Sequence, residues 1–232
     1  PVPILKNLSR GSNKGGDAKQ TTGLNQPKAL PLDANGKGYC YLPVTTGNAP
    51  AVTFPTIGAN DDFVLEMDVY FVATNGCYLV TGATSAHRFF LTNSLFLFSG
   101  GLSAALSSPV SEGFSTIRIE RTSGSISLYQ DGVLKSTPTA APDAYSFTHL
   151  SFNGQFSSGI PPLNGYIQKA TLSIGGTEQL NIDFTATNIR HGDTKFKCAT
   201  GQVVTINQSG NDPATIIKKS VLRFDGTNDF VE

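Results

Sequence analysis

Hydrophobic and polar residues alternate in the middle of the chain, over residues 114–137. Ile117 and Ile119 fall on one side of an extended backbone. Arg118 and Glu120 fall on the opposite side. A period of two is typical of a β-strand with one buried face and one face in water. The pattern therefore predicts a half-buried strand here.

A hairpin is expected directly after that strand. Behind Thr122-Ser123-Gly124 the alternation starts again, with Ile126 and Leu128 on the apolar side. Asp131-Gly132 is a residue pair that suits the positive φ angles of a tight type I′ turn. Because Val133-Leu134 resumes the apolar pattern after this turn, we expect three consecutive antiparallel strands.

Short apolar runs recur along the chain, separated by Gly, Asn, Asp, Ser and Pro. The clearest is DDFVLEMDVYFV at residues 61–72. Further strands are expected at 78–81, 88–91, 95–98, 146–152 and 163–174. No stretch combines a helical period with a helix-forming composition over the dozen or so residues of a typical helix. With 24 Gly, 13 Pro and only 15% charged residues, the chain is predicted to be an all-β sandwich.

The chain has 232 residues, enough for one sandwich domain with a sizeable core. We divide it into an extended N-terminal arm (1–37), a β-sandwich (38–176) and a C-terminal β segment that packs on the sandwich or extends it (177–232). The apolar residues of the arm gather at its tip, at Val2, Ile4, Leu5 and Leu8. The arm is either a loose terminus or an anchor that docks on a neighbour.

The net charge and the length of the apolar runs argue against two classes of partner, nucleic acids and membranes. Lys and Arg total 17, and Asp and Glu total 17, so the formal net charge is zero. Nucleic-acid binding would lose its electrostatic driving force, and no partner of that class is expected. No apolar run approaches the roughly 20 residues that span a bilayer, so we expect no membrane insertion. The start of the chain shows no signal-peptide pattern.

The three cysteines, Cys40, Cys77 and Cys198, are far apart and form no C-x-x-C pair. Zinc sites and disulfide frameworks need a different spacing, so buried structural thiols are expected. No cofactor and no metal site is expected either. Asp61-Asp62, and the acidic turn around Asp225, offer oxygens of the kind that calcium uses, without the spacing of a known calcium loop.

The segment RTSGSISLYQDGVL at residues 121–134 resembles the laminin-G/concanavalin A-like family. In that family, R-x-G-x-I-x-L-Y-x-D-G-x-L marks two adjacent strands. The resemblance implies a two-sheet antiparallel jelly-roll sandwich, here with an extended N-terminal arm and a C-terminal β appendage.

The two flanks of the chain resemble structural proteins of tailed bacteriophages. The segments are QPKALPLDANGKGYCYLP before the sandwich, and NIDFTATN, KFKCATGQVVTIN and SVLRFDGTNDFVE after it. Val44 departs from the pattern, which has Gly there. The resemblance implies a non-enzymatic virion protein, assembled in the host cytoplasm and exposed on the particle as a capsid decoration or tail fibre component. Its partners would be other virion proteins or sister subunits. The last of these segments would close the sandwich or pair with another subunit.

Two acids on the 61–72 strand raise the question of catalysis. In the glucanase branch of the same superfamily, E-x-D-x-x-E on one strand supplies the catalytic carboxylates. Glu66 and Asp68 match the first two positions, but the third is Phe71, which can neither give nor take a proton. We therefore expect a solvated strand face and no enzyme, and a glycoside hydrolase is the least favoured alternative.

The favoured alternative to a purely structural role is a carbohydrate-binding adhesin module that recognises a host surface polysaccharide. Sugar sites combine aromatic rings with planar polar side chains. Candidates for glycan or partner contacts are Glu66, Asp68, Tyr70, Tyr129, Asn153 and Gln155. Each of these residues taken singly is also typical of plain solvated surface.

Overall fold

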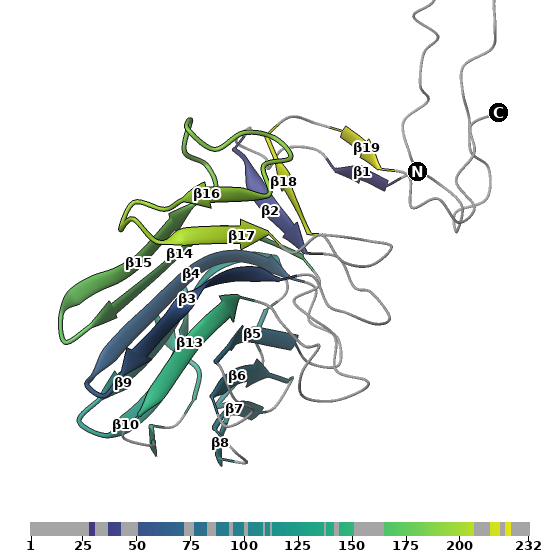
Figure 1. Cartoon of the computed structure of the whole chain (residues 1–232). Helices are drawn as coiled ribbons and strands as arrows, with labels where there is room; N and C mark the ends of the chain where they lie inside the picture. Colours follow the sequence, from purple (N-terminus) through teal and green to yellow (C-terminus); the bar gives the residue numbers. More distant parts are fainter. Residues whose placement is uncertain are drawn as a thin grey trace, which may run out of the picture.

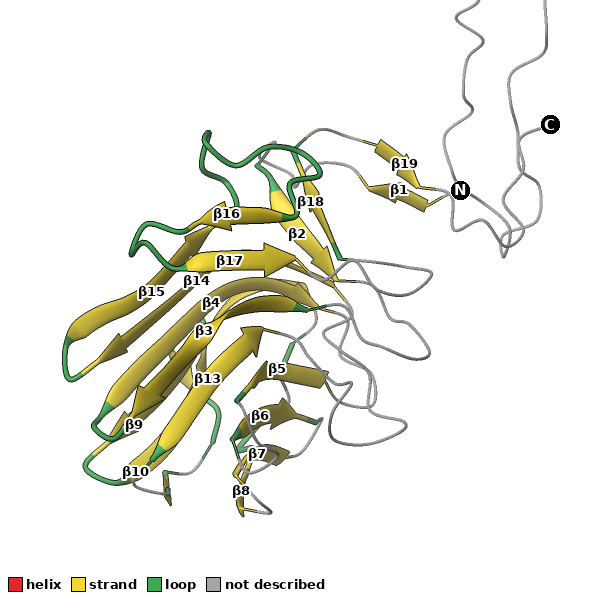
Figure 2. Ribbon diagram, in the orientation of Figure 1, coloured by secondary structure: helices red, strands yellow, loops and turns green. Residues whose placement is uncertain are grey.

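Two antiparallel sheets lie face to face and make up the body of the chain (Figure 1). The computed structural model describes residues 28–30, 37–42, 51–71, 77–82, 87–92, 95–99, 102–108, 110–111, 113–136, 138–141, 144–150, 165–206, 214–218 and 221–223. Every regular element within these ranges is a β-strand (Figure 2). In the same ranges, no helix is long and apolar enough to cross a membrane. The predicted all-β class is confirmed.

The first sheet has nine strands. They are β2 (Tyr39–Leu42), β4 (Phe63–Phe71), β9 (Gly113–Thr122), β10 (Ser125–Gln130), β11 (Val133–Leu134), β12 (Thr139–Ala140), β14 (Gly165–Ile174), β15 (Thr177–Asp183) and β18 (Thr215–Ile217). Their order is β11-β10-β9-β4-β14-β2-β18, with β12 beside β10 and β15 beside β14. Strand β4 therefore lies in the middle of the nine-stranded sheet.

The second sheet has eight strands. They are β3 (Val52–Ala59), β5 (Cys77–Thr81), β6 (Arg88–Leu91), β7 (Leu95–Ser99), β8 (Leu102–Ala105), β13 (Tyr145–Leu150), β16 (Lys195–Lys197) and β17 (Val203–Ile206). Their order is β16-β17-β3-β13-β5-β6-β7-β8. Strands β15 to β18 thus continue both sheets, since β17 pairs with β3 and β18 with β2.

The predicted hairpin turns are present. Asp131 and Gly132 have φ angles of 51° and 77°, as a type I′ turn requires, and they join Gln130 to Val133 in register. Ser123 and Gly124, with φ angles of 50° and 74°, make the corresponding two-residue connection between β9 and β10. Gly124, Asp131 and Gly132 are residue types that tolerate the left-handed region, whereas Ser123 is an unusual residue there.

The core lies between the two sheets and is lined by the residues that the alternation placed inward. From the nine-stranded sheet it contains Leu65, Met67, Val69, Ile117, Ile119 and Leu128, each no more than 1% exposed. From the eight-stranded sheet, the Phe89 and Phe147 rings pack edge-on against Phe63. Burial of these side chains fixes which face of each strand is turned to solvent.

Strand β3 continues through Pro55, a residue that cannot donate a hydrogen bond to a neighbouring strand. The structure accommodates it because β17 pairs only with the first part of β3, at Val52 and Thr53. On the other side, the register with β13 shifts between Phe147 and His149, opposite the proline. The strand pattern alone does not reveal this tolerance.

Two short strands from opposite ends of the chain pair with each other. Strand β1 (Lys28–Leu30) lies within the predicted arm, and it runs antiparallel to β19 (Val221–Arg223). They form a two-stranded sheet of their own beside the sandwich (Figure 1). The proposed anchor residues Val2, Ile4, Leu5 and Leu8 lie outside the described residues, as does the acidic turn around Asp225.

The core assignment predicts the effect of Leu128→Asp. Leu128 is fully buried, and an unpaired carboxylate there should cost several kcal/mol, which is of the order of a whole domain's stability. Thermal melting should show a large loss of Tm or no folded protein. Val133→Asp is the matched control, because Val133 lies in the same hairpin and is 59% exposed. Equal melting temperatures for the two variants would contradict the assignment.

Candidate functional site

Four of the predicted site residues share the outer face of the nine-stranded sheet, the side turned away from the core. Glu66, Asp68 and Tyr70 alternate with buried residues along β4. Tyr129 lies on β10, two strands away. Arg118 of β9 stands between them, in register with Glu66 on one side and Tyr129 on the other. Asn153 and Gln155 lie outside the described residues.

Arg118 is the central residue of a polar row that runs across three strands, from Glu66 through Arg118 to Tyr129. Its guanidinium donates to Glu120 across 2.7 Å and lies 5.2 Å from the centre of the Tyr129 ring. These contacts hold the cation over the ring, a favourable placement for an arginine. For the exposed Glu66, the structure describes no hydrogen bond. Its carboxylate is therefore an available acceptor on this face.

Asp68 belongs to the next row, in which it is in register with Thr116 and Lys169. The Thr116 hydroxyl donates to Asp68 Oδ1 across 2.8 Å. Lys169 instead pairs with Asp183 of β15, with 3.3 Å between Nζ and Oδ2. The half-buried Asp68 is thus oriented by one neighbour and keeps acceptor capacity.

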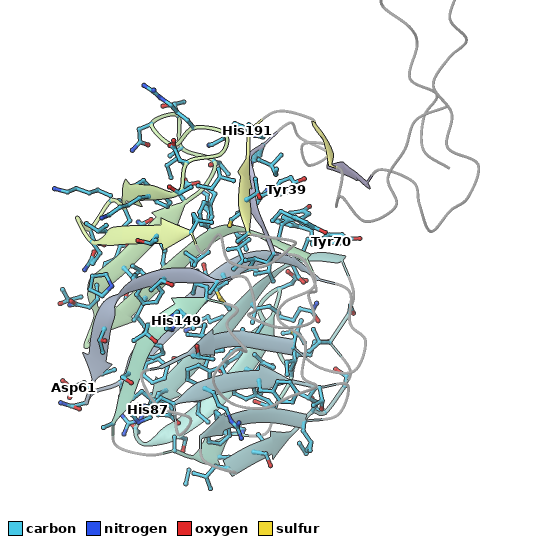
Figure 3. All side chains as sticks on the ribbon, turned by 45° about the vertical axis from the view of Figure 1, so that its right-hand side comes forward. Tyr39, Asp61, Tyr70, His87, His149 and His191 are labelled. Carbon is cyan, nitrogen blue, oxygen red and sulfur yellow. The ribbon has the colours of Figure 1, made fainter. Side chains whose placement is uncertain are left out.

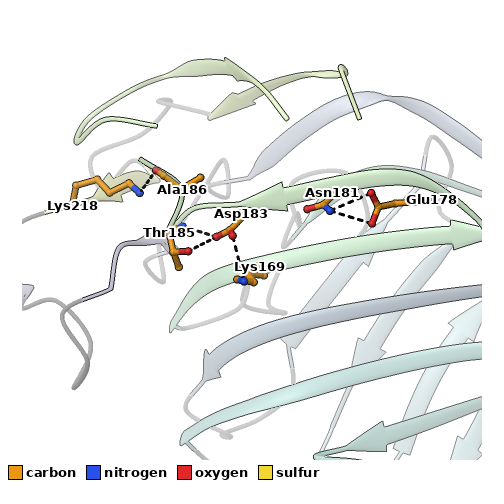
Figure 4. Close-up of polar contacts among 7 residues, drawn as sticks. All are labelled: Lys169, Glu178, Asn181, Asp183, Thr185, Ala186 and Lys218. Atoms are coloured by element: carbon orange, nitrogen blue, oxygen red, sulfur yellow. Dashed lines mark hydrogen bonds and ion pairs between the residues drawn. The ribbon is translucent and has the colours of Figure 1, made fainter. Parts of the chain in front are cut away.

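Asp183 is held in its ionised form by its neighbours (Figure 4). Burial alone would raise its pKa, but hydrogen bonds from the Thr185 hydroxyl and amide, together with Lys169, lower it below the usual range. Beside it, Lys218 donates to the Ala186 carbonyl across 2.7 Å. Burial lowers the pKa of Lys218, and Asp183 partly opposes this change.

A row of aromatic side chains crosses the same face beyond Asp68. The centre of the Tyr166 ring lies 4.3 Å from the centre of the Tyr39 ring and 5.1 Å from the centre of the Tyr70 ring. Both pairs are stacked. The Phe114 ring stacks 6.4 Å from Tyr166. Figure 3 shows Tyr39 and Tyr70 close together, at the end of the molecule away from Asp61. Three strands that are distant in sequence, β2, β4 and β14, meet here.

Stacking decides which of these rings can receive a ligand. Tyr39 is only 3% exposed, and Tyr166 is enclosed between Tyr39 and Tyr70, so the faces of these rings are largely occupied by protein. Phe114 is 51% exposed and Tyr70 is 37% exposed, and the two residues are in register. An exposed aromatic pair of this kind offers apolar ring surface that a ligand can cover.

Sequence reasoning did not single out Phe114, Tyr166 or Lys169. For Phe114 a signal was present, because the alternation that turns Ile117 and Ile119 inward turns Phe114 outward. No comparable signal exists for Tyr166, whose neighbours Tyr39 and Tyr70 are far away in the chain. Only the strand order brings them together.

The acids of this face do not form the carboxylate pair of the glucanase branch. Glu66 and Asp68 occupy successive outward positions on β4, and Phe71 ends the strand at the third position of that motif. Asp183, across Lys169 from Asp68, is kept ionised, whereas a general acid needs a raised pKa. What the face can do is accept hydrogen bonds beside an exposed ring.

A hollow of about 340 Å³ lies at the opposite end of β4, where Asp62, Arg121 and Gly175 are among its lining residues. The Arg121 guanidinium lies 3.4 Å from Asp62, and both oxygens of Asp62 accept the Ser123 amide at 3.0 Å. Because these charges satisfy each other, the hollow has no unpaired charge to attract an ion. Asp62 is thus engaged within the protein, which weakens the calcium alternative at this turn.

Histidines and cysteines offer no metal centre among the described residues, which contain no group of three or more potential ligands. His191 lies at the far end of the molecule from His87 (Figure 3). All three cysteines are buried free thiols, as predicted. Burial raises the pKa of Cys77 to about 12 and raises that of Cys40 further, so both stay protonated and unreactive.

No protein-family model and no curated protein matches the chain. Among solved structures, it is similar to a protein of Bacteroides ovatus described as a "putative carbohydrate binding protein". The TM-score is 0.58 at 11% identity, covering 81% of this chain and 62% of that one. The chain therefore spans less than two thirds of that structure. A heptameric SAP-like pentraxin from Limulus polyphemus is also similar, with a TM-score of 0.46 at 10% identity, covering 73% and 95% of the two chains.

Identities this low show the fold alone. Together with the two antiparallel sheets, the likeness to the Bacteroides ovatus structure confirms the predicted jelly-roll sandwich. None of the comparisons tests the resemblance to bacteriophage structural proteins, which stays a prediction.

The state of Asp183 predicts a pH-dependent effect of Asp183→Asn. A lowered folded pKa contributes stability that is present above the unfolded pKa of about 3.9, and is lost as pH falls through the folded pKa. The difference in Tm between wild type and Asp183→Asn should therefore be largest near neutral pH and should vanish in acid. Asp61→Asn, at an exposed residue, is the control. A difference that is constant between pH 7 and pH 2 would contradict the prediction.

Proposed function

We propose that the protein is a carbohydrate-binding module whose binding face is the outer face of the nine-stranded sheet around Phe114 and Tyr70. The observation that carries the proposal is the exposed aromatic pair, placed next to carboxylates that have acceptor capacity. The proposed action is binding without cleavage. The target would be a surface polysaccharide, as in the alternative to a structural role that the sequence left open.

A sugar ring has an apolar face of C–H groups and a rim of hydroxyls. The apolar face would lie on the Phe114 ring, which removes apolar surface of both partners from water. The rim hydroxyls would donate to Asp68 and Glu66, which are the first and second outward-facing residues before Tyr70 on β4. Hydrogen bonds to charged acceptors are the stronger kind, and they would set the orientation of the sugar.

The charges on this face favour a neutral saccharide. The carboxylates of Glu66, Asp68, Glu120 and Asp183 outnumber the cations of Arg118 and Lys169. Arg118 and Lys169 are already paired with Glu120 and Asp183. A uronic or sialic acid would bring a further carboxylate, and the described residues of this face hold no uncommitted cation to receive it, which costs Coulomb energy. We therefore place neutral glycans above acidic ones.

The fold supports the proposal without deciding it. The similar Bacteroides ovatus protein is described as a "putative carbohydrate binding protein", and the present chain shares its sandwich. Jelly-roll sandwiches serve many functions, so the argument rests on the face itself.

The test is binding to an array of neutral and acidic polysaccharide fragments, followed by calorimetric titration of the best ligand. Phe114→Ala, and separately Glu66→Gln with Asp68→Asn, should weaken binding about tenfold or more, while Tm stays near wild type. Lys195→Ala is the control, since Lys195 is exposed on the other sheet, far from both the proposed site and β8. No binding to any glycan, or binding that both variants keep, would refute the proposed site.

A structural role in a virion is the second candidate, and the two roles are compatible. One observation favours it: β1 and β19 bring both phage-like flanks together beside the sandwich. Such an arrangement suits a module attached to a larger assembly through its flanks. In this role the apolar tip at Val2, Ile4, Leu5 and Leu8 would anchor the chain on a virion protein or a sister subunit.

Deletion of residues 1–26 tests the anchor and leaves β1 intact. We expect a Tm close to that of the full chain, because the deleted residues cannot build a core of their own. Co-purification with intact particles should fall sharply. A second variant replaces Val2, Ile4, Leu5 and Leu8 by Ser and keeps the rest of the chain. It should lose association with particles as the deletion does. Unchanged association of both variants with particles would contradict an anchoring arm.

A further inference from the structure

Strand β8 is the free edge of the eight-stranded sheet (Figure 1). It pairs with β7 on one side, in the register Leu95 with Ala105 and Phe96 with Ala104. Within the described part of the chain, its backbone has no further hydrogen-bond partner. Leu102, Ser103 and Ala105 are exposed. An edge of this kind presents unpaired N–H and C=O groups to any strand that approaches.

The two edges of this sheet differ in charge. From Phe89 to Ser111 the sequence contains no Asp, Glu, Lys, Arg or His, so β6, β7 and β8 are almost free of charge. At the opposite edge, β16 exposes Lys195 and Lys197. Lysines on an edge strand discourage pairing with another chain, and β8 lacks this protection.

Exposed apolar side chains lie on β8 and on its neighbour β7. Leu95 is 39% exposed and Leu102 is 46% exposed. Leu106, the next residue after β8, bridges to Ser136 in the other half of the sandwich. Just before Ser136, Val133 and Leu134 of β11 are 59% and 42% exposed. Of the six exposed large apolar residues of the described chain, Leu95 and Leu102 thus lie on the two outermost strands at this edge, and Val133 and Leu134 lie just before the Ser136 bridge.

The edge is also held in place. The Ser107 amide donates to the Lys135 carbonyl at 2.7 Å, and the Ser107 hydroxyl donates to the same oxygen at 3.0 Å. The Lys135 ammonium donates to the Ser108 hydroxyl across 3.2 Å, so this cation is turned back onto its own chain. An edge that is already ordered loses little entropy when a partner strand binds.

We propose that two copies of the chain pair antiparallel through β8, which joins their eight-stranded sheets into one continuous sheet. Antiparallel pairing of two identical strands has twofold symmetry, so each residue of the edge faces the same region of the partner's edge. A charge there would meet its own copy, and the absence of charge removes this repulsion. The zero net charge of the chain removes long-range repulsion as well. The exposed Leu95 and Leu102 of both copies would be covered together.

Sedimentation equilibrium on the full chain tests the proposal. We expect a concentration-dependent species of twice the 24.5 kDa chain mass. Ser103→Lys with Ala105→Lys should weaken the dimer at least about thirtyfold, because it places like charges against each other across the twofold axis. The matched control, Thr194→Lys with Ala199→Lys, adds the same two charges at exposed residues next to β16, the opposite edge strand of the sheet. It should leave the dimer intact.

Hydrogen exchange on the unaltered chain provides a second readout that does not depend on folding of a variant. The β8 amides that point away from β7 should become protected as protein concentration rises. A wild-type chain that is monomeric at 100 µM would overturn the proposal. So would an oligomer that keeps its affinity in the Ser103→Lys, Ala105→Lys variant, or one without concentration-dependent protection in residues 102–105. Either of the two oligomeric results would place the contact between copies on the arm or on another surface.

Discussion

Strand β4 is paired along its whole length, with β9 on one side and β14 on the other. The rest of the structure depends on this central pairing. Because successive side chains of a strand point to opposite faces, burying Leu65, Met67 and Val69 forces Glu66, Asp68 and Tyr70 outward. A register shift of one residue would bury two carboxylates and expose the core. The hydrophobic core and the candidate binding face are therefore consequences of one constraint.

Much of the fold could be predicted from local patterns. Most strands between residues 61 and 174 were predicted to within a few residues, because alternation and the Asp131-Gly132 turn are signals carried by neighbouring residues. Strands β8 and β12 were not predicted. Strand β3 was harder, since Pro55 is tolerated only because of how β13 and β17 pair around it. The candidate site was predictable in part: the outward positions on β4 follow from alternation. The stack of Tyr39, Tyr70 and Tyr166 does not, because it depends on strand order.

The outer face combines these local and long-range features into one surface. Its ion pairs hold Arg118 and Lys169 in place, so the cations are committed to the protein's own carboxylates. Its tyrosines are largely committed to one another. What remains available is the Phe114 ring, the edge of Tyr70 and the acceptors of Glu66 and Asp68. This remainder suits a ligand with one apolar face and several hydroxyls, which is why a neutral sugar is the favoured partner.

The most direct test of this account is to map a bound saccharide on the protein by NMR. A neutral oligosaccharide selected on the array would be titrated into isotope-labelled protein while backbone and aromatic shifts are followed. The account predicts saturable shift changes centred on Phe114, Tyr70 and Asp68, with little change at the Asp62–Arg121 hollow or along β8. Saturable changes centred on the hollow, on the eight-stranded sheet or on the flanks would contradict it.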